Sequence, residues 1–297
     1  MSDFDVKSFT IPGQYYLDGV LLGSYNPPDG MKALREFDLF EDDCIVAAYP
    51  KSGQTWTLEL VYLVLHHGTA YERENTARDM RTPWIEWGPV DEERLRNISN
   101  IPRPRVFKTH AIAKHLPVQL REKNVKMVFV FRNPKDVAVS YYHFYRMNAV
   151  LSRFPGTWSQ FYEMFMAGNV AHGSWFDYVQ EYWREFKDDK NVLFLYYEDM
   201  VKDHAGSVRK IANFLGRNLR DDVVEDIVKR TSFKTMKDNF ATRAHKIPFF
   251  DENISPFFRK GNVGDWKNHF TVRQNEDFDR VYAEKVAESG FCIDFGE

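Results

Sequence analysis

Ile45-Val46-Ala47-Ala48-Tyr49-Pro50-Lys51-Ser52-Gly53-Gln54-Thr55-Trp56 is the stretch that decides the fold class of this chain. Its first part, Ile45 to Tyr49, is apolar at consecutive positions, which is typical of a strand covered on both faces of a parallel sheet. A helical pattern, Thr55 to His66, begins directly after the loop. Free backbone N–H groups and the helix dipole converge at such a junction. The sequence therefore predicts an anion site at a helix start in an α/β fold.

Three further apolar runs predict the rest of this sheet: Val106 to Lys108, Met127 to Phe131 and Val192 to Tyr196. Helical patterns at Lys135 to Met147 and Phe176 to Phe186 alternate with them, as in α/β proteins with crossover helices. We expect residues 1–297 to form one domain with a central parallel sheet flanked by helices, because no linker or repeat interrupts the pattern. Thr242 to Gly264 is broken up by Pro and Gly, and its phenylalanines favour a flap over a ligand: Phe249, Phe250, Phe257 and Phe258.

Composition narrows the possible functions. The 297 residues are 43% hydrophobic and 28% charged, as in an ordinary globular protein. The net charge of -3 argues against nucleic-acid or acidic-membrane partners, and no apolar run approaches the ~18 residues that span a bilayer. Two cysteines, Cys44 and Cys292, are too few for a disulfide framework and lack metal-ligand spacing. We therefore expect a cytoplasmic protein without a metal site, and its 16% aromatic content favours a cavity for flat apolar ligands.

The loop after the first strand carries the groups that bind phosphate. Lys51 brings a cation, Ser52 and Thr55 bring hydroxyl groups, and Gly53 lets the backbone approach a ligand closely. The two glycines five residues apart that mark the loop of nucleotide kinases are absent, so ATP hydrolysis is a poor match. An ordinary helix start, with Ser52 or Thr55 as the cap and Lys51 in solvent, remains open from these residues alone.

Three other patterns have the same ambiguity. Arg132 ends a predicted strand and offers a bidentate fork, with Ser140 two helical turns farther along. The segment Arg259-Lys260-Gly261 combines two cations with a glycine. His110 follows a predicted strand, where α/β sheets hold ligands, and lies near Lys108. Each pattern is also compatible with solvated, capping or core residues.

Together, these motifs resemble those of the cytosolic sulfotransferases. Tyr49 to Trp56 resembles the family's 5'-phosphosulfate loop, which usually reads Tyr-Pro-Lys-Ser-Gly-Thr-Thr-Trp, and it departs from that motif at Gln54. Arg132 to Tyr142 resembles the 3'-phosphate motif. Arg259-Lys260-Gly261 with Gly264-Asp265-Trp266-Lys267 matches a family signature in order and spacing, and Lys108-Thr109-His110 resembles the catalytic motif. The resemblance extends from Lys51 to Glu276.

The resemblance implies a P-loop-kinase-like sulfotransferase fold and transfer of a sulfuryl group from 3'-phosphoadenosine-5'-phosphosulfate (PAPS). His110 is implied as the general base, with Lys51 and Lys108 offsetting charge on the leaving phosphate. The product, adenosine 3',5'-bisphosphate (PAP), is expected to inhibit. The residues implied to bind the nucleotide are Lys51, Ser52, Gly53, Gln54, Thr55, Trp56, Arg132, Ser140, Tyr197, Thr231, Phe233, Arg259, Lys260 and Gly261.

The resemblance also implies a pocket for a small apolar acceptor, with Tyr25 as a further candidate beside Trp84, Trp87, Lys108, His110, Phe144, Phe249 and Phe257. Both tryptophans replace phenylalanines that are usual in the family, which suits a planar ring. Asn148 offers no carboxylate for an ammonium group, so phenols are favoured over catecholamines, while steroids, other alcohols and amines stay open. A C-terminal motif implies a homodimer through Lys267, Thr271, Val272 and Glu276.

Two other functions compete with this hypothesis. A nucleotide kinase would need Mg²⁺ and the second loop glycine, and would prefer ATP to PAPS. A non-catalytic PAPS-binding module would keep the fold without turnover. The presence of His110, Lys51 and Lys108 disfavours the second alternative.

Overall fold

A four-stranded parallel sheet lies at the centre of this computed structural model, which describes residues 5–67, 81–88, 91–242, 247–286 and 289–293. Its order is β4-β3-β5-β6, and the strands are β3 (Cys44–Ala47), β4 (Val106–Thr109), β5 (Lys126–Phe131) and β6 (Val192–Tyr196). Residue Cys44 pairs with Val106 on one side and with Lys126 on the other. The prediction of an α/β fold with a central parallel sheet is confirmed.

The predicted element ends shift by up to two residues. The first strand ends at Ala47 rather than at Tyr49. The carbonyl of Ala48, directly beyond the strand, accepts a hydrogen bond from the ring of His110 (2.6 Å). The three predicted helices are present as α2 (Gln54–Leu65), α6 (Pro134–Met147) and α8 (Trp175–Phe186).

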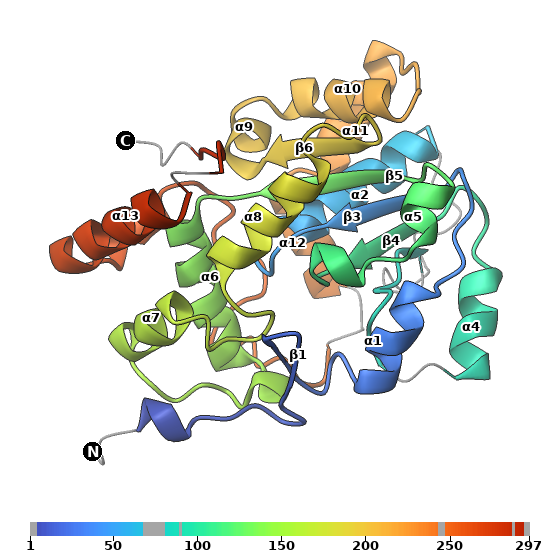
Figure 1. The fold of residues 1–297 in the computed structure, drawn as a ribbon. Helices are drawn as coiled ribbons and strands as arrows, with labels where there is room; N and C mark the ends of the chain where they lie inside the picture. The colour runs from blue at the N-terminus through green and yellow to red at the C-terminus, as the bar shows by residue number, and fades with distance from the viewer. Residues whose placement is uncertain (1–4, 68–80, 89–90, 243–246, 287–288, 294–297) are drawn as a thin grey trace.

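Helices cover both faces of the sheet, which explains why its strands are apolar at consecutive positions. Alternate strand side chains belong to two separate cores: Ile45 and Phe129 pack with residues of α6 and α8, whereas Val46 and Val128 pack with residues of α2. In Figure 1, α8 passes in front of the sheet and α2 lies behind it. The result is a three-layer α/β arrangement.

The remaining elements surround these layers. A short antiparallel hairpin precedes the sheet and consists of β1 (Tyr15–Leu17) and β2 (Val20–Leu22). The other helices are α1 (Pro28–Arg35), α4 (Glu92–Ser99), α5 (Gln119–Glu122), α7 (Trp158–Met166), α9 (Tyr197–Lys202), α10 (His204–Phe214), α11 (Asp221–Arg230), α12 (Phe233–Thr242) and α13 (Val272–Val286). Single 3₁₀ turns are η1 (Val6–Ser8), η3 (Ala113–His115), η4 (Ala149–Leu151) and η5 (Asp265–Asn268).

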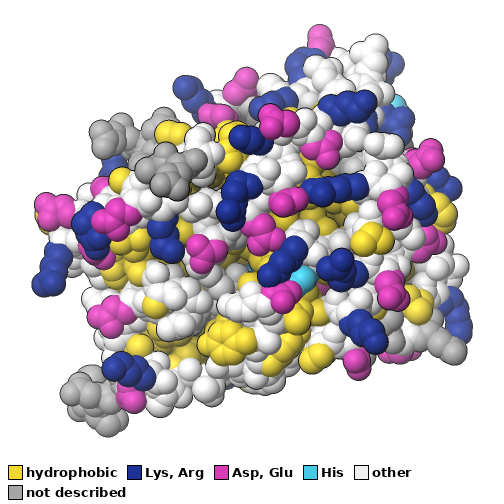
Figure 2. Space-filling model, in the orientation of Figure 1, with side chains coloured by type: hydrophobic (Ala, Val, Ile, Leu, Met, Phe, Trp, Pro, Cys, Tyr) yellow, Lys and Arg dark blue, Asp and Glu magenta, His cyan; other side chains and the backbone are white. Residues whose placement is uncertain are grey.

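The outer surface carries charges of both signs. Figure 2 shows Lys and Arg interspersed with Asp and Glu over the visible face, without a continuous basic area. Within the part of the chain that the structure describes, no helix has both the length and the apolar character needed to cross a bilayer.

Candidate active site

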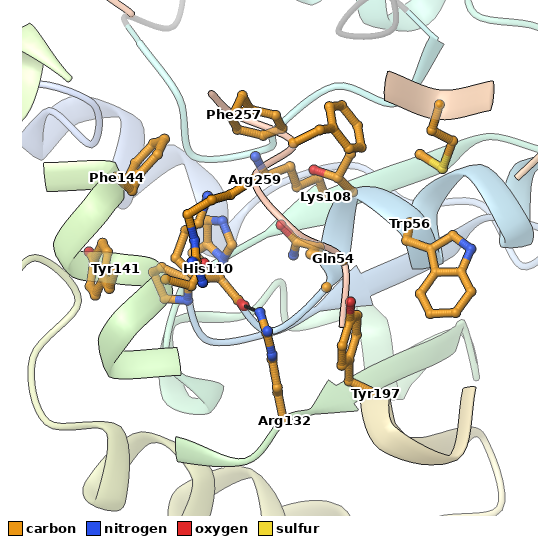
Figure 3. Close-up of a pocket in the computed structure, with 18 of the residues that line it drawn as sticks. Gln54, Trp56, Lys108, His110, Arg132, Tyr141, Phe144, Tyr197, Phe257 and Arg259 are labelled. Carbon is orange, nitrogen blue, oxygen red and sulfur yellow. Dashed lines mark hydrogen bonds between the residues drawn. The ribbon is translucent and has the colours of Figure 1, made fainter. Parts of the chain in front are cut away.

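A cavity of about 410 Å³ opens at the carboxyl ends of the four parallel strands. Each strand leads into a residue of its wall: Pro50 after β3, His110 after β4, Arg132 after β5 and Tyr197 after β6. This edge is where α/β sheets hold ligands. In Figure 3, His110, Tyr141 and Phe144 lie on one side of the cavity, Trp56 and Tyr197 on the other, and Arg132 and Gln54 between them. The cavity therefore has two ends joined by a charged middle.

The predicted phosphate loop forms the floor of this middle. Gly53 precedes α2 with a φ of 95°, in the left-handed region, and a Cβ there would lie 2.6 Å from the ring of Tyr197. Both constraints require glycine. The amides of Trp56 (3.0 Å) and Thr57 (3.1 Å) donate to the carbonyl of Gly53, so the amides that precede Trp56 are the ones available to an anion at this helix start. The loop thus has the geometry of a phosphate cradle.

Two residues of the predicted phosphate loop, Ser52 and Gln54, do not use their side chains as phosphate-binding groups would. Ser52 is buried and is not among the residues that line the cavity, because the tight turn in which its N–H donates to the carbonyl of Tyr49 (3.2 Å) places it in the interior. Gln54 lines the cavity, but its side-chain amide donates to the carbonyls of Val46 (2.9 Å) and Thr109 (2.6 Å). Gln54 therefore links the ends of β3 and β4, and its backbone N–H remains in the loop.

Arg132 is a buried cation with unused hydrogen-bonding capacity. Its Nη1 donates to the carbonyl of Lys51 (3.0 Å), its guanidinium lies 4.5 Å from the ring centroid of Tyr197, and its Nε has no hydrogen-bond partner among the described residues. A buried donor without a partner is costly unless a ligand satisfies it. Ser140, on α6, lines the same cavity. These groups fit an anion that the protein does not itself supply.

The segment Arg259-Lys260-Gly261 brings further cations to the cavity. Both cations pair with the buried carboxylate of Asp265. Burial raises the pKa of Asp265, but hydrogen bonds from Lys260, Asn268 and Arg259 outweigh it and hold the pKa well below its usual range. The loop stays beside α6 because Asp136 accepts the amides of Gly264 (2.7 Å) and Trp266 (2.9 Å).

Residues suited to a flat polar ring line one end of the cavity. Trp56, Tyr197, Thr231 and Phe233 all line it, and the indole Nε1 of Trp56 is buried without a partner among the described residues. Gly261 approaches Phe233 so closely that a Cβ would lie 2.1 Å from its ring. Aromatic faces with an unused donor suit a nucleobase.

His110 is buried at the start of the other end. Its Nδ1 hydrogen-bonds the carbonyl of Ala48 (2.6 Å). A carbonyl only accepts, so Nδ1 carries the proton and Nε2 keeps its lone pair. Burial, followed by the charges of Lys108, His172 and Lys51, lowers the pKa of His110 well below its usual range. The ring is therefore neutral at physiological pH, with Nε2 able to accept a proton.

Two lysines lie beside this histidine. The ammonium of Lys108 is 4.2 Å from the ring centroid of Trp84, and that of Lys51 is 4.2 Å from the ring centroid of Phe144. Burial and the nearby charges of Arg132, Lys108 and Arg259 lower the pKa of Lys51 to about 7. Several cations crowded into one cavity repel each other, and an anion relieves that repulsion.

Aromatic rings form the wall around His110. Tyr25 makes edge contacts with Trp87 (5.1 Å between centroids) and Phe249 (5.7 Å). Trp84 meets His110 edge-on at 5.1 Å. All the residues predicted for the acceptor pocket line this part of the cavity: Trp84, Trp87, Lys108, His110, Phe144, Phe249 and Phe257. Phe250 from the predicted flap contacts Phe144 here (5.3 Å between centroids), whereas Phe258 lines the cavity beside Phe233 (6.1 Å). Residues 243–246 of that segment lie outside the described residues.

Three further residues were not found from the sequence. The carboxylate of Glu86 is fully buried and accepts the backbone N–H of His110 (2.5 Å). His172 lines the cavity beside His110, and His204 contacts Trp56 edge-on (5.0 Å between centroids) and hydrogen-bonds Thr231 (2.9 Å). None of the three belongs to a local motif, so only the fold brings them to the site.

The four residues predicted for a dimer contact lie away from the cavity, around η5 and the start of α13. All four are exposed, and Val272 is exposed to 76%. No group of three or more His, Cys, Asp or Glu side chains suited to a metal ion occurs among the residues that the structure describes.

Comparison with known proteins agrees with this geometry. The family model of the sulfotransferase domain matches residues 41–290. Sulfotransferase 1C2 of Rattus norvegicus is 42% identical over 271 residues, covering 90% of this chain and 91% of the relative. Sulfotransferase 1A1 of Bos taurus is 42% identical over 285 residues, covering 95% and 96%.

Solved structures show the same fold. Mouse sulfotransferase SULT7A1 complexed with PAP has a TM-score of 0.78 and 36% identity, covering 93% of this chain and 96% of that one. Retinol dehydratase in complex with androsterone and inactive cofactor PAP has a TM-score of 0.79 and 26% identity, covering 94% and 90%. The chain belongs to the sulfotransferase family. It is an enzyme of the PAPS-dependent class, which transfers a sulfuryl group to an acceptor.

Proposed function

We propose that this enzyme transfers the sulfuryl group of PAPS to the hydroxyl of a small, planar, apolar acceptor, with a phenol as the preferred class, and that His110 is the general base. The main observation that supports this proposal is the lining of the cavity. Its middle gathers cations from three distant segments, one end has aromatic faces for a base, and the other has a neutral histidine among aromatic rings. Mouse SULT7A1 and retinol dehydratase, which share the fold, were both solved with PAP.

The nucleotide would lie across the middle and the base-binding end. The loop amides, Lys51 and Thr55 would hold the 5' side, and Arg132, Ser140, Arg259 and Lys260 the 3'-phosphate. The unsatisfied donors of Arg132 and Trp56 fit this assignment. PAPS supplies the sulfuryl group on a phosphate leaving group.

The protein's own groups would carry the proton and the charge. Nε2 of His110 would take the proton of the acceptor hydroxyl, because the bond from Nδ1 to Ala48 fixes this tautomer. Lys51 and Lys108 would offset the negative charge that develops on the phosphate side. Glu86 would hold the backbone of His110 in place.

The acceptor class follows from the lining of the second end. Its walls are aromatic, and the side-chain amide of the buried Asn148 donates to the hydroxyl of Tyr25 (2.9 Å) behind them. A flat neutral ring with one hydroxyl suits such a pocket.

Sulfotransfer from PAPS to simple phenols, measured with steroids and arylamines in parallel, tests the proposal. We expect phenols to give the highest kcat/KM and PAP to inhibit competitively with PAPS; absence of turnover with every class would contradict it.

Binding of PAP is expected to be linked to proton uptake by Lys51. Its pKa of about 7 in the free protein makes it mostly neutral at pH 8. The phosphates of PAP favour the charged form and raise this pKa. Affinity should therefore decrease as the pH rises from 7 towards 9, and the complex should take up close to one proton at pH 8.

Calorimetry in two buffers with different ionisation enthalpies measures this uptake. The matched control is Lys51→Arg, which keeps the charge but does not titrate in this range. It should bind PAP without proton uptake. Equal uptake by both proteins would show that another group is responsible.

We also propose that residues 1–297 act as one domain, in the cytoplasm, and as a homodimer through Lys267, Thr271, Val272 and Glu276. The exposed apolar side chain of Val272 between opposite charges supports a self-complementary contact. Lys267→Glu should shift the chain to the monomer on a sizing column, because Glu276 of the partner would then face a like charge. The double variant Lys267→Glu, Glu276→Lys should restore the dimer; unchanged elution of the single variant would remove this contact.

A further inference from the structure

His172 is a second buried histidine in the cavity, and the proposed mechanism does not use it. It lies in the connection between α7 and α8, where only 6% of its surface is exposed. Its ring is 5.4 Å from that of His110 and 6.3 Å from that of Trp84, measured between centroids. His172 is therefore at the reacting end of the cavity rather than in the general core.

The backbone around His172 is held rigidly. Residues on either side of it are bound by tyrosine hydroxyls: Tyr141 donates to the carbonyl of Ala171 (2.8 Å), and Tyr49 donates to that of Gly173 (2.7 Å). The N–H of His172 itself donates to the carbonyl of Leu21 (2.8 Å). Such a network fixes the backbone from which the ring projects before any acceptor binds.

His172 also adopts an unfavourable backbone conformation. Its φ is 68°, in the left-handed region that non-glycine residues seldom occupy. Gly173 follows directly and also has a positive φ, so two successive residues of this turn lie in the left-handed region, where glycine is the favoured residue. A side chain kept in this conformation, with its ring on the wall of a ligand cavity, indicates a role for the ring.

The charge state of His172 decides what its ring can accept. Burial and the charge of Lys108 lower the pKa of His172 to about 3, so the ring stays neutral. A neutral imidazole has one protonated nitrogen and one nitrogen with a lone pair, and the latter can accept a hydrogen bond from a hydroxyl.

Resting on the proposed function, we infer that His172 is a specificity-determining residue that accepts a hydrogen bond from a second hydroxyl of the acceptor, adjacent to the hydroxyl that faces His110. The two imidazoles are neighbours on the cavity wall, with ring centroids 5.4 Å apart, so two hydroxyls on neighbouring atoms of one acceptor can reach both rings. The favoured class is an aromatic ring with vicinal hydroxyls, a catechol without a charged amine. A methoxy group at the same place cannot donate and would leave the ring nitrogen unsatisfied.

The test compares three acceptors that differ only at that position: catechol, 2-methoxyphenol and phenol. The wild-type chain should show the highest kcat/KM with catechol. In His172→Phe, kcat/KM for catechol should fall about tenfold, mainly through KM, while phenol changes by less than about threefold, because one hydrogen bond is lost. His172→Asn keeps a hydrogen-bond acceptor, and asparagine tolerates a positive φ. This variant should therefore restore part of the catechol preference.

Stabilisation of each variant by PAP in thermal unfolding shows that the fold and the nucleotide site are intact. Equal losses with phenol and catechol, or an unchanged ratio between them, would overturn the role of His172. A wild-type chain that binds PAP but sulfates none of the three acceptors would instead contradict the proposed acceptor class, and this inference with it.

Discussion

Replacing His110 with glutamine is expected to lower kcat by roughly 10²–10⁴-fold, the usual contribution of a general base. The amide keeps much of the size of the imidazole but cannot take the proton of the acceptor hydroxyl. Nδ1 of His110 hydrogen-bonds Ala48, so the wild-type ring presents Nε2 as the base, and burial keeps it neutral by lowering its pKa. Steady-state assays with PAPS and a phenol measure the loss.

Binding of PAP is the internal control for this variant. His110 lies at the acceptor end, so the dissociation constant of PAP should change by less than about threefold. The same kcat in both proteins would exclude His110 as the base. A loss of turnover matched by an equal loss of PAP binding would assign the residue to the nucleotide site.

Arg132→Gln is expected to raise the dissociation constant of PAP about 100-fold, equivalent to about 2.8 kcal/mol, because a buried cation is removed from a phosphate. In the free protein, Arg132 is fixed by the carbonyl of Lys51, while its Nε has no partner among the described residues. The prediction is specific for the 3'-phosphate. AMP, which lacks that phosphate, should bind the variant and the wild-type chain within about threefold of each other.

Titrations of PAP and AMP distinguish two roles of Arg132: binding the 3'-phosphate directly, or holding the phosphate loop in place. Equal weakening of PAP and AMP would mean that Arg132 acts by holding the phosphate loop through Lys51. Arg132→Lys, which keeps the charge but loses the fork, should fall between the wild type and the glutamine variant.

The sheet and the phosphate loop could be predicted because their signals are local. Four apolar runs, each followed by a polar or glycine-containing segment, define the strands and the edge at which they open. Gly53 signals the left-handed start of α2 within a few residues of Lys51. The second phosphate segment and the Arg259 loop required the family resemblance, because two cations in a row also occur in ordinary solvated turns.

Other parts of the site depend on contacts between distant segments. Glu86, His172 and His204 carry no motif, and each joins the site through a residue far along the chain: His110 for the first two and Trp56 for the third. The burial of Ser52 and the use of the Gln54 amide between β3 and β4 follow from the turn and the sheet, which the loop sequence alone does not describe.

Calorimetric titration of PAP into the protein measures whether the cations of Lys51, Arg132, Arg259 and Lys260, brought together by the fold, bind one nucleotide with phosphates on its 3' and 5' sides. We expect saturable binding of PAP, tighter than that of AMP or ATP. An absence of binding heat across several temperatures and buffers, or a preference for ATP, would contradict it.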